Sequence, residues 1–460
     1  MSVVSASPAG GGRSPLSKVR ALQHALYRTA KADPGRRFHA LWDKILRRDV
    51  LARAWFEVRR NDGAPGIDQV TLADVEEYGV ARLLDELAAD LRHGSYRPLP
   101  ARRVFIPKPG QPDARRPLSI PSVRDRIVQA ALKVVIEPVF EADFLPCSFG
   151  FRPKRGQHDA LQVVIDEAWR GRVWVVETDV ANCFEAIPHS ELMRAVQERI
   201  CDQSVLKLLR AMLRAGVMQD GVVHTSASGT PQGGVASPLL CNVYLHRIDR
   251  AWDARGHGTL IRFADDALVM CTSREQAEAA LQRLRELLAE LGLEPKEAKT
   301  RIVQLRVGGE GLDFLGFHHR LVLTRSRRTG KSFTFLARWP ADKAMRHARD
   351  RIRELTDRRR LLIGVETIVG DLNVFLTGWA AYFKYGNSAE RFDAIRHYTR
   401  TRMALFIAKR HKRSRGFGWN VVAYASPNHL GLVSLAGIVV APRPERAWRE
   451  KPNAGGERRR

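Results

Sequence analysis

The sequence has little of what marks disulfide-rich, zinc-stapled or membrane-spanning proteins. Its 460 residues include five cysteines, scattered without a CxxC pair: Cys147, Cys183, Cys201, Cys241 and Cys271. This spacing suggests neither a zinc knuckle nor a disulfide framework. There is no internal repeat, and no run approaches the roughly 18 apolar residues of a membrane-spanning helix. We therefore expect a soluble intracellular protein with no membrane partner, located in the cytoplasm or, in a bacterium, acting at the nucleoid.

Acidic residues are also scarce relative to basic ones. The chain has 76 Lys and Arg against 50 Asp and Glu, a formal net charge of +26. Such an excess is typical of proteins that bind nucleic acid, and a generally basic surface is the alternative. Residues 401–460 hold 13 Lys or Arg and three Glu, a net charge of +10, but also the apolar run LGLVSLAGIVV. The C-terminal region is therefore not simply a basic tail.

The spacing of apolar residues predicts an α+β protein. Helical spacing covers residues 38–60, 71–92, 124–142, 157–170, 190–213, 236–253 and 273–292. Strands are expected in RRVFIPK and RRPLSIP, which form a hairpin, at 172–180, around Asp265 and over 301–337. Basic helical segments follow at 341–360, 365–385 and 389–412. This order indicates an α+β body followed by a mostly helical basic module.

Two acidic segments interrupt apolar strands. LIRFADDALVMCT (259–271) contains Asp265 and Asp266, and VETDVANCFEAIPH places Asp179 at the end of a buried strand. Taken singly, adjacent aspartates favour a hairpin turn, and a lone Asp often caps a turn. Three carboxylates from two neighbouring strands are also the donor set of a site with two metal ions, which clamps an in-line phosphoryl transfer. Mg²⁺ prefers such oxygen ligands.

Two further segments carry residues suited to a nucleotide. The loop GTPQGG (229–234) precedes a helix that begins near Ser237. Its glycines allow close backbone approach, and Gln232 offers an amide to a base pair or a sugar. Lys108 and Arg116 flank the turn of the first hairpin and are suited to a triphosphate. An ordinary loop-to-helix junction and a solvated basic hairpin explain these two segments at least as well when each is considered alone.

In this order the four segments resemble the group II intron reverse transcriptases, also called intron-encoded maturases. Other strings that resemble motifs of this family are NDGAPGID (61–68), SFGFRPKRGQHDAL (148–161), GLEPKEAKTRI, LDFLGF and LTGWAAYFKYG (376–386). The resemblance runs from residue 61 to about residue 415. It implies a right-hand polymerase fold, with fingers and a palm built on antiparallel sheet, followed by a helical thumb or X domain.

The resemblance also implies a division of the chain. The expected parts are a flexible N-terminus (1–14), an N-terminal extension with fingers (15–170), a palm with the catalytic carboxylates (171–340), a thumb or X domain (341–415) and a basic DNA-contacting region (416–460).

Individual roles follow from the same resemblance. Asp179, Asp265 and Asp266 would bind two Mg²⁺ ions, and the backbone carbonyl of Val180 would add a ligand. Phe184 would lie under the nucleotide sugar and disfavour a 2′-hydroxyl. The remaining implied contacts are Lys108 and Arg116 with the incoming triphosphate, Gln232 with nucleotide or template, Lys299 as proton donor to pyrophosphate, and Leu315 and Gly316 with the primer end.

The chain departs from the family pattern in two ways. Phe263 stands where the usual motif has Tyr, which leaves the carboxylates intact but removes a hydroxyl that bears on primer contact or fidelity. No Cys follows Cys271, so the paired cysteines of the HNH endonuclease found in many relatives are missing. We therefore expect no second-strand cleavage by this chain, and priming from another source such as a nascent strand at a replication fork.

The leading expectation is an RNA-directed DNA polymerase that copies intron RNA during retrohoming and assists its splicing. Its partners would be intron RNA, target DNA and dNTPs, and the oligomeric state stays open, a dimer included. A second hypothesis is a splicing maturase that does not depend on polymerisation, with RNA bound by 341–415 and by the aromatics Trp379, Tyr382, Phe383 and Tyr385. The i, i+4 spacing of Trp379 and Phe383 favours helix core instead. A third is a domesticated relative that serves DNA repair or CRISPR adaptation.

Nucleic-acid binding should weaken steeply with salt, because each phosphate neutralised by Lys or Arg releases counterions. If six or more phosphates are contacted, we expect affinity to fall about 10³-fold or more between roughly 50 and 200 mM salt. Fluorescence anisotropy at several ionic strengths measures the slope of log affinity against log salt. A nearly flat slope would contradict a surface that follows the phosphate backbone.

Overall fold

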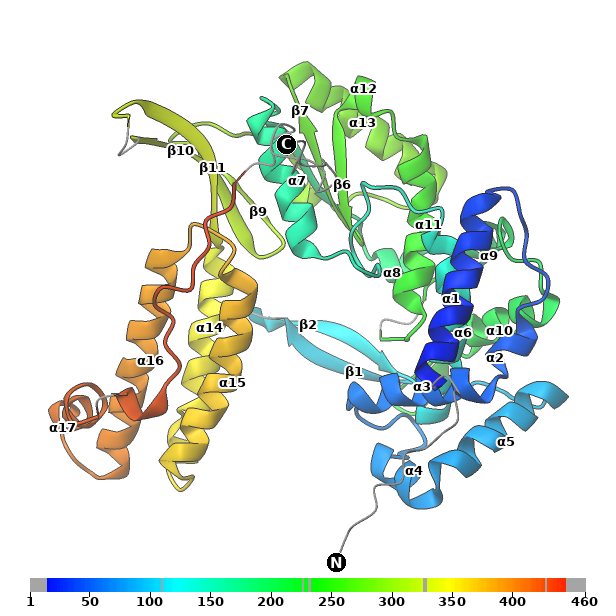
Figure 1. The fold of residues 1–460 in the computed structure, drawn as a ribbon, viewed down its shortest axis with the longest axis horizontal. Coiled ribbons are helices and arrows are strands. Elements are labelled where there is room, and N and C mark those ends of the chain that lie inside the picture. The colour runs from blue at the N-terminus through cyan, green and yellow to red at the C-terminus, as the bar shows by residue number, and fades with distance from the viewer. Residues whose placement is uncertain are drawn as a thin grey trace, which may run out of the picture.

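The structure is a computed structural model that describes residues 15–108, 111–225, 227–230, 233–325, 329–426 and 428–443. The side chains of residues 15, 108 and 111–114 lie outside this description. Helices and three small sheets alternate along the chain, which confirms the predicted α+β class (Figure 1). Within the described residues, no helix has the length and apolar character needed to cross a membrane.

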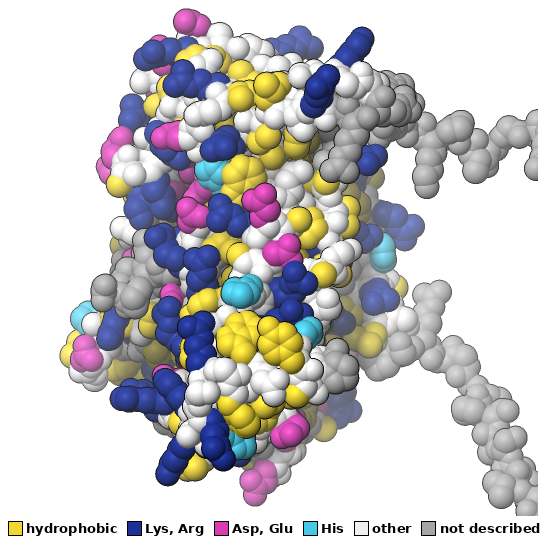
Figure 2. All heavy atoms as spheres, turned by 90° about the vertical axis from the view of Figure 1, so that its left-hand side faces the viewer, with side chains coloured by type: hydrophobic (Ala, Val, Ile, Leu, Met, Phe, Trp, Pro, Cys, Tyr) yellow, Lys and Arg dark blue, Asp and Glu magenta, His cyan; other side chains and the backbone are white. Residues whose placement is uncertain are grey.

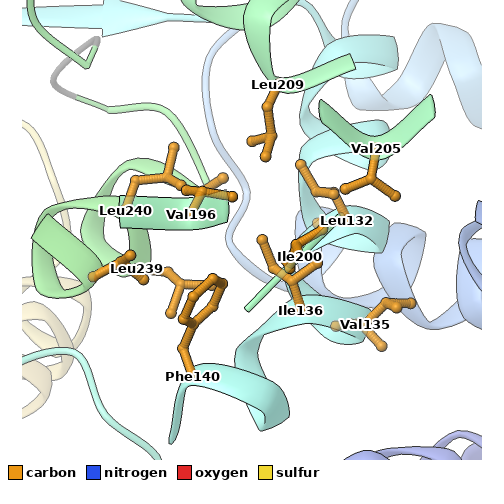
Figure 3. Packing of buried hydrophobic residues seen from close by; sticks show 14 of the residues in the cluster. Leu132, Val135, Ile136, Phe140, Val196, Ile200, Val205, Leu209, Leu239 and Leu240 are labelled. Carbon is orange, nitrogen blue, oxygen red and sulfur yellow. The ribbon is translucent and has the colours of Figure 1, made fainter. Parts of the chain in front are cut away.

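The N-terminal third is a layer of helices around one long buried helix, α6 (Val123–Glu141). The helices before it are α1 (Pro15–Ala32), α2 (Trp42–Ile45), α3 (Arg48–Arg60), α4 (Leu72–Tyr78) and α5 (Val80–His93). Leu132, Ile136 and Phe140 of α6 point toward Val196 and Leu239 of later helices (Figure 3). This contact joins parts of the chain far apart in sequence into one core.

Three of the predicted helices prove to be two helices each. The 38–60 prediction divides into α2 and α3, the 71–92 prediction divides at Gly79, and the 190–213 prediction divides into α9 (His189–Gln197) and α10 (Gln203–Arg214). Gly79 has φ +104, which ends α4. Asp202 caps α10 by accepting hydrogen bonds from the backbone of Ser204 and Val205. Its other oxygen accepts from Leu41 and Trp42 at the start of α2, at 2.8 and 2.9 Å.

The predicted hairpin is present as β1 (Ala101–Lys108) and β2 (Gln111–Ile120). Two short strands that the sequence analysis missed, β4 (Val217–Gln219) and β5 (Val222–His224), extend it to the order β2-β1-β4-β5. β1 and β4 pair in parallel through two residues. A strand distant in sequence thus joins the hairpin by a short parallel pairing, while the other strand pairs of this sheet are antiparallel.

A second sheet has the order β6-β7-β3-β8, and all its strands are antiparallel. Its strands are β3 (Trp174–Asp179), β6 (Thr259–Phe263), β7 (Asp266–Cys271) and β8 (Arg301–Gln304). The flanking helices are α7 (Gln157–Trp169), α8 (Cys183–Ala186), α11 (Ser237–Ala251), α12 (Ala254–His257) and α13 (Arg274–Glu290). Val175 and Val176 lie in two different hydrophobic clusters, and both are fully buried. Both faces of β3 are therefore covered, as its continuous apolar sequence predicted.

The C-terminal part begins with β9 (Leu312–Phe314), β10 (Phe317–Arg325) and β11 (Ser332–Pro340), in the order β11-β10-β9. It continues with α14 (Asp342–Leu355), α15 (Val365–Phe383), α16 (Ala389–Arg410) and α17 (Arg415–Trp419), which form a separate group in Figure 1. Trp379 and Phe383 are buried against each other, and Trp379 also contacts Phe392. The helix-core interpretation of these two aromatics is confirmed.

Candidate active site

The three predicted metal-binding aspartates converge at the end of the second sheet. Asp179, the last residue of β3, lies directly opposite Asp266, the first residue of β7. Residues directly opposite each other in an antiparallel pair project from the same face of the sheet. Asp265 precedes Asp266 in the turn, and its backbone carbonyl accepts a hydrogen bond from the Val180 backbone at 3.2 Å. The spatial arrangement on which the sequence argument depended is therefore present.

The turn that carries Asp265 has an unusual backbone. β6 and β7 are joined by Ala264 and Asp265 alone, and Ala264 has φ +58, which is uncommon for a residue other than glycine. Gly150 packs directly against this turn, since a Cβ added to it would lie 2.5 Å from the Ala264 backbone nitrogen. Any larger residue at 150 would displace the turn. This gives a physical reason for the glycine of SFGFRP.

Negative charge is concentrated and partly buried at this site. Burial, followed by the charges of Asp265 and Asp179, raises the pKa of Asp266 to about 7. Burial and the charge of Asp179 also raise the pKa of Asp265. The ammonium of Lys299 lies 2.6 Å from Asp179 Oδ2. Although burial opposes its charge, the hydrogen bond to Asp179 and the nearby carboxylates raise the Lys299 pKa. The cluster therefore favours cations.

The donor set suits a hard divalent cation that arrives with its substrate. Among the described residues, no group of three or more His, Cys, Asp or Glu side chains is arranged to hold a metal ion. Mg²⁺ sites in phosphoryl-transfer enzymes use one or two carboxylates and take the remaining ligands from water and substrate phosphates. The aspartates fit that pattern. In this structure the Lys299 ammonium pairs with one of the two Asp179 oxygens. The predicted Val180 carbonyl ligand stays a prediction.

One pocket of about 500 Å³ adjoins the carboxylates on the side of the C-terminal helices. Leu315 and Gly316 form the two-residue turn between β9 and β10, with φ +47 and φ +78. The Tyr382 hydroxyl of α15 donates to the Leu315 carbonyl at 2.8 Å, which holds this turn against the helices. The pocket is lined by Asp179, Asp266, Lys299, Leu315 and Gly316, with Lys343 and His347 of α14. The residues predicted to hold the primer end thus lie beside the aspartates, while their contact with a primer stays a prediction.

A second pocket, of about 510 Å³, contains Arg116 and Phe184. Gly233 and Gly234 of the GTPQGG loop also line it, and Gly233 packs against the backbone of β2. Lys108 has its side chain outside the described part of the structure, and Gln232 lies outside it altogether. Their predicted contacts with the nucleotide, like those of Arg116 and Phe184, stay predictions.

Sequence reasoning missed two residues that the structure brings to this region, Phe151 and Arg262. Phe151, in the string SFGFRP, lines the second pocket with a 51% exposed side chain and φ +56. An exposed aromatic in this backbone conformation is unusual enough to indicate a functional position. Arg262, within the apolar strand LIRF, is buried against Asp249. A charged residue inside an apolar strand was the signal that could have marked it. Phe263, which replaces the usual Tyr, lies opposite Asp266.

Comparison with known proteins assigns the chain to a family. The model "Reverse transcriptase (RNA-dependent DNA polymerase)" matches residues 106–319, and "Group II intron, maturase-specific domain" matches residues 345–425. Protein YkfC of Escherichia coli strain K12 is 35% identical in an alignment 353 residues long, which covers 67% of this chain and 90% of YkfC. Group II intron-encoded protein LtrA of Lactococcus lactis subsp. cremoris is 35% identical over 215 residues, 46% of this chain and 35% of LtrA.

The chain belongs to the group II intron reverse transcriptases and maturases. The predicted family and the predicted pairing of a reverse transcriptase with a maturase domain are confirmed. The reverse transcriptase match accounts for the palm and fingers of the fold. An uncharacterized 91 kDa protein in the cob intron of Schizosaccharomyces pombe is 26% identical over 84% of this chain and 55% of that protein. The chain thus spans only about a third of LtrA and half of the cob intron protein. The domain boundaries predicted from the sequence stay predictions.

Removing the charge of Asp266 should stabilise this reverse transcriptase when metal is withheld. The folded pKa of about 7 lies above the usual value near 4, so folded protein binds the proton more tightly than unfolded protein. Ionised Asp266 therefore destabilises the wild type above pH 7. In EDTA at pH 8, Asp266→Asn should unfold at a higher urea concentration than the wild type. At roughly 1.4 kcal/mol per unit of pKa shift, its free energy of unfolding should be higher by up to a few kcal/mol. The gain should shrink below pH 7 and vanish near pH 4.

The control for this experiment is Glu77→Gln, which neutralises an exposed carboxylate far from the site and should leave the midpoint nearly unchanged at both pH values. Equal stability of Asp266→Asn and the wild type at pH 8 would contradict the accumulation of buried negative charge.

Proposed function

We propose that the chain copies RNA into DNA at the cluster of Asp179, Asp265 and Asp266. One observation carries this proposal: strand pairing brings carboxylates from distant segments to one point, and this point borders one of the two pockets. One pocket offers Arg116 and Phe184 for an incoming nucleotide. The other offers the Leu315–Gly316 turn for the end of a primer. A templated polymerase needs this arrangement, because its two reacting substrates must meet at the metal-binding groups.

The chemistry would be an in-line nucleotidyl transfer. The 3′-hydroxyl of the primer loses its proton to solvent, and its oxygen forms a bond to the α-phosphorus of a dNTP. The bond from that phosphorus to the bridging oxygen of the leaving pyrophosphate breaks. When bound, two Mg²⁺ ions stabilise the charge on the attacking and leaving oxygens. Arg116 can contact phosphate oxygens with two parallel N–H groups. Lys299, which donates a hydrogen bond to Asp179, would release that carboxylate to bound cations and would donate a proton to the leaving group.

The second part of the proposal is that the C-terminal helices act as a thumb and bind the intron RNA. Figure 2 faces the side of the molecule that these helices occupy in Figure 1 and shows Lys and Arg side chains along its whole height. Lys343, Arg346 and Arg353 of α14 are exposed. Trp379 and Phe383 are buried, so phosphate contacts by Lys and Arg, rather than base stacking on these two rings, would carry affinity. This proposal includes contacts between residues 416–460 and target DNA. It also includes a role of the chain in retrohoming.

A double substitution should separate polymerisation from RNA binding. Asp265→Asn with Asp266→Asn keeps the shape of the turn but removes two anionic metal ligands. Primer extension on poly(rA)/oligo(dT) with Mg²⁺ should fall by about 10³-fold or more, as when members of one catalytic unit are removed. Affinity for poly(rA), measured by anisotropy, should stay within about twofold because the basic helices are unchanged.

Asp313→Asn is the matched control for this pair, since Asp313 lines the same pocket outside the aspartate cluster. It should retain most activity. Full extension by the double variant would refute the polymerase proposal, and a parallel loss of RNA affinity would refute the separation of the two functions.

A smaller residue at Phe184 should admit ribonucleotides. If the ring lies under the sugar, Phe184→Val removes its clash with a 2′-hydroxyl. The ratio of kcat/KM for rATP to that for dATP should rise by about 10-fold or more, in the range expected for a steric change of one side chain. Phe56→Val, a change at an exposed ring on α3, is the control. An unchanged ratio would show that Phe184 does not select the sugar.

A further inference from the structure

A buried ion pair lies directly behind the turn that carries Asp265. The Arg262 guanidinium bonds both oxygens of Asp249, with Nε to Oδ1 at 2.8 Å and Nη2 to Oδ2 at 2.5 Å. Arg262 is 3% exposed and Asp249 is 2% exposed. Removing two charges from water is costly, and well-packed apolar residues often serve stability better. The position of this pair therefore calls for a reason other than stability.

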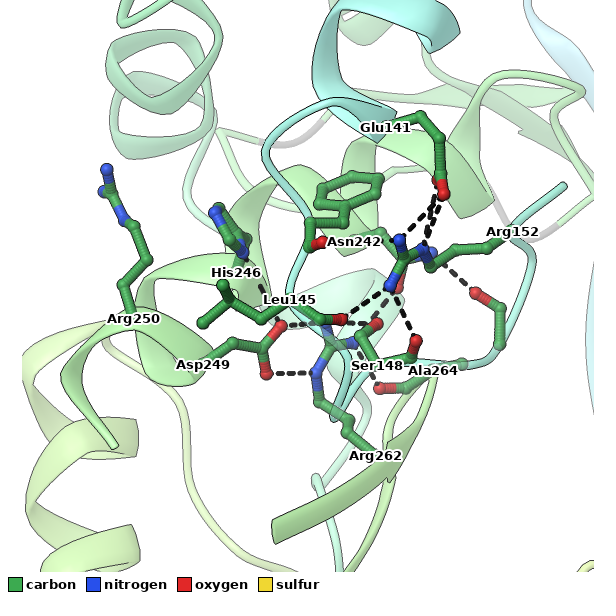
Figure 4. Close-up of polar contacts among 12 residues, drawn as sticks. Glu141, Leu145, Ser148, Arg152, Asn242, His246, Asp249, Arg250, Arg262 and Ala264 are labelled. Atoms are coloured by element: carbon green, nitrogen blue, oxygen red, sulfur yellow. Dashed lines mark hydrogen bonds and ion pairs between the residues drawn. The ribbon is translucent and has the colours of Figure 1, made fainter. Parts of the chain in front are cut away.

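The same guanidinium reaches three separate parts of the chain (Figure 4). Its Nη1 donates to Asn242 Oδ1 on α11 and to the Ala264 carbonyl in the turn, both at 3.0 Å. Its Nη2 donates to the Ser148 hydroxyl at 2.9 Å. The Ala264 carbonyl belongs to the peptide that leads into Asp265. Arg262 thus fixes the orientation of that peptide relative to a helix and a loop.

The loop on the other side of the turn is held by the same group of contacts. Asn242 Nδ2 donates to the Gly150 carbonyl at 2.7 Å, and Gly150 packs against the Ala264 nitrogen. Backbone hydrogen bonds join Phe149 to Arg262 and Arg262 to Cys147, at 2.9 and 2.8 Å. A second arginine, Arg152, pairs with Glu141 and donates to the Leu145 and Ser148 carbonyls, which fastens the loop at its ends (Figure 4).

We propose that Arg262 is a positioning residue that holds the Ala264–Asp265 turn in its strained form and so presents Asp265 and Asp266 to divalent cations. Without a donor to the Ala264 carbonyl, the turn could relax from φ +58, and the repulsion between the aspartates favours that relaxation. A lysine keeps the charge beside Asp249, but its single ammonium lacks the rigid fork that reaches Asp249, Asn242, Ser148 and Ala264 together. The inference rests on the proposed polymerase function.

The test measures metal binding directly and activity separately. Arg262→Lys and Asn242→Ala remove, respectively, the fork and its neutral partner. Free Mn²⁺ in titrations of each full-length variant is measured by electron paramagnetic resonance, and the Mg²⁺ concentration for half-maximal primer extension is measured on poly(rA)/oligo(dT). We expect Arg262→Lys to weaken Mn²⁺ binding and raise the Mg²⁺ requirement by about 10-fold or more, the effect typical of groups that orient metal ligands. Asn242→Ala should shift both quantities in the same direction by a smaller factor.

The matched control is Glu167→Gln, which alters a buried acid at the opposite end of β6. Glu167 is 3% exposed and accepts from Arg172 and from the Thr259 hydroxyl, at 2.5 and 2.8 Å. This variant should lower the melting temperature without changing Mn²⁺ binding or the Mg²⁺ requirement. The positioning role is overturned if Arg262→Lys loses stability while both metal measurements match the control.

Two further outcomes, a variant that does not fold and a wild type without polymerase activity, can be told apart from those above. Should Arg262→Lys fail to fold, Asn242→Ala decides, because it removes no charge, and unaltered metal binding in it overturns the proposal. A wild type that binds Mn²⁺ but extends no primer would refute the polymerase function, while the change in Mn²⁺ affinity between variants would still decide the role of Arg262.

Discussion

The antiparallel register of β3 against β7 is the constraint on which the site depends. It sets Asp179 opposite Asp266, and a slip of one residue would turn the Asp179 side chain to the other face of the sheet. The register is specified by burial on both faces, because Val175 and Val176 of β3 are fully covered on opposite sides. Apolar packing thus enforces an arrangement of like charges that electrostatics alone would oppose.

This arrangement stores unfavourable energy at the site. Burial and mutual repulsion raise the pKa of Asp266 to about 7, and Ala264 adopts a left-handed backbone conformation. Such strain persists only where the surroundings determine the backbone, and here they do so through the packing of Gly150 and the hydrogen bonds of Arg262. Cations relieve the repulsion, so a cluster that is costly without metal is matched to a reaction that supplies metal with the nucleotide.

The reverse transcriptase and maturase parts meet at a small turn. Leu315 and Gly316 border the pocket beside the aspartates, and Tyr382 of the maturase-specific region holds Leu315 through its carbonyl. The C-terminal segment adds further links, with Val440 bonded to Lys384 on the helical side and Arg443 bonded to Gln162 of α7. Helices suited to RNA and carboxylates suited to catalysis therefore share one framework, so RNA held by the helices would have a defined position relative to the site.

Local sequence determined most of the elements and the identity of the three aspartates. Apolar periodicity located the buried strand before Asp179 and the core positions of Trp379 and Phe383, because these patterns reflect burial on one or two faces of a single element. Elements and contacts that depend on residues distant in the sequence could not be predicted from local sequence patterns. Asp202 lies within one predicted helix, but it caps α10 and also accepts hydrogen bonds from the start of α2, about 160 positions away. Likewise, β4 joins β1 across the chain.

The contacts that support the candidate active site were likewise decided only by the tertiary structure. Sequence patterns assigned no role to Arg262 or Gly150. In the structure, Asp249, Asn242 and the Ala264 carbonyl surround the Arg262 guanidinium, and Gly150 packs against Ala264. The sequence by itself determined which groups could do the chemistry, since residue type fixes charge and donor atoms. Only the tertiary structure decided how those groups are held, because hydrogen bonds and steric contacts between distant segments exist only once the chain has folded.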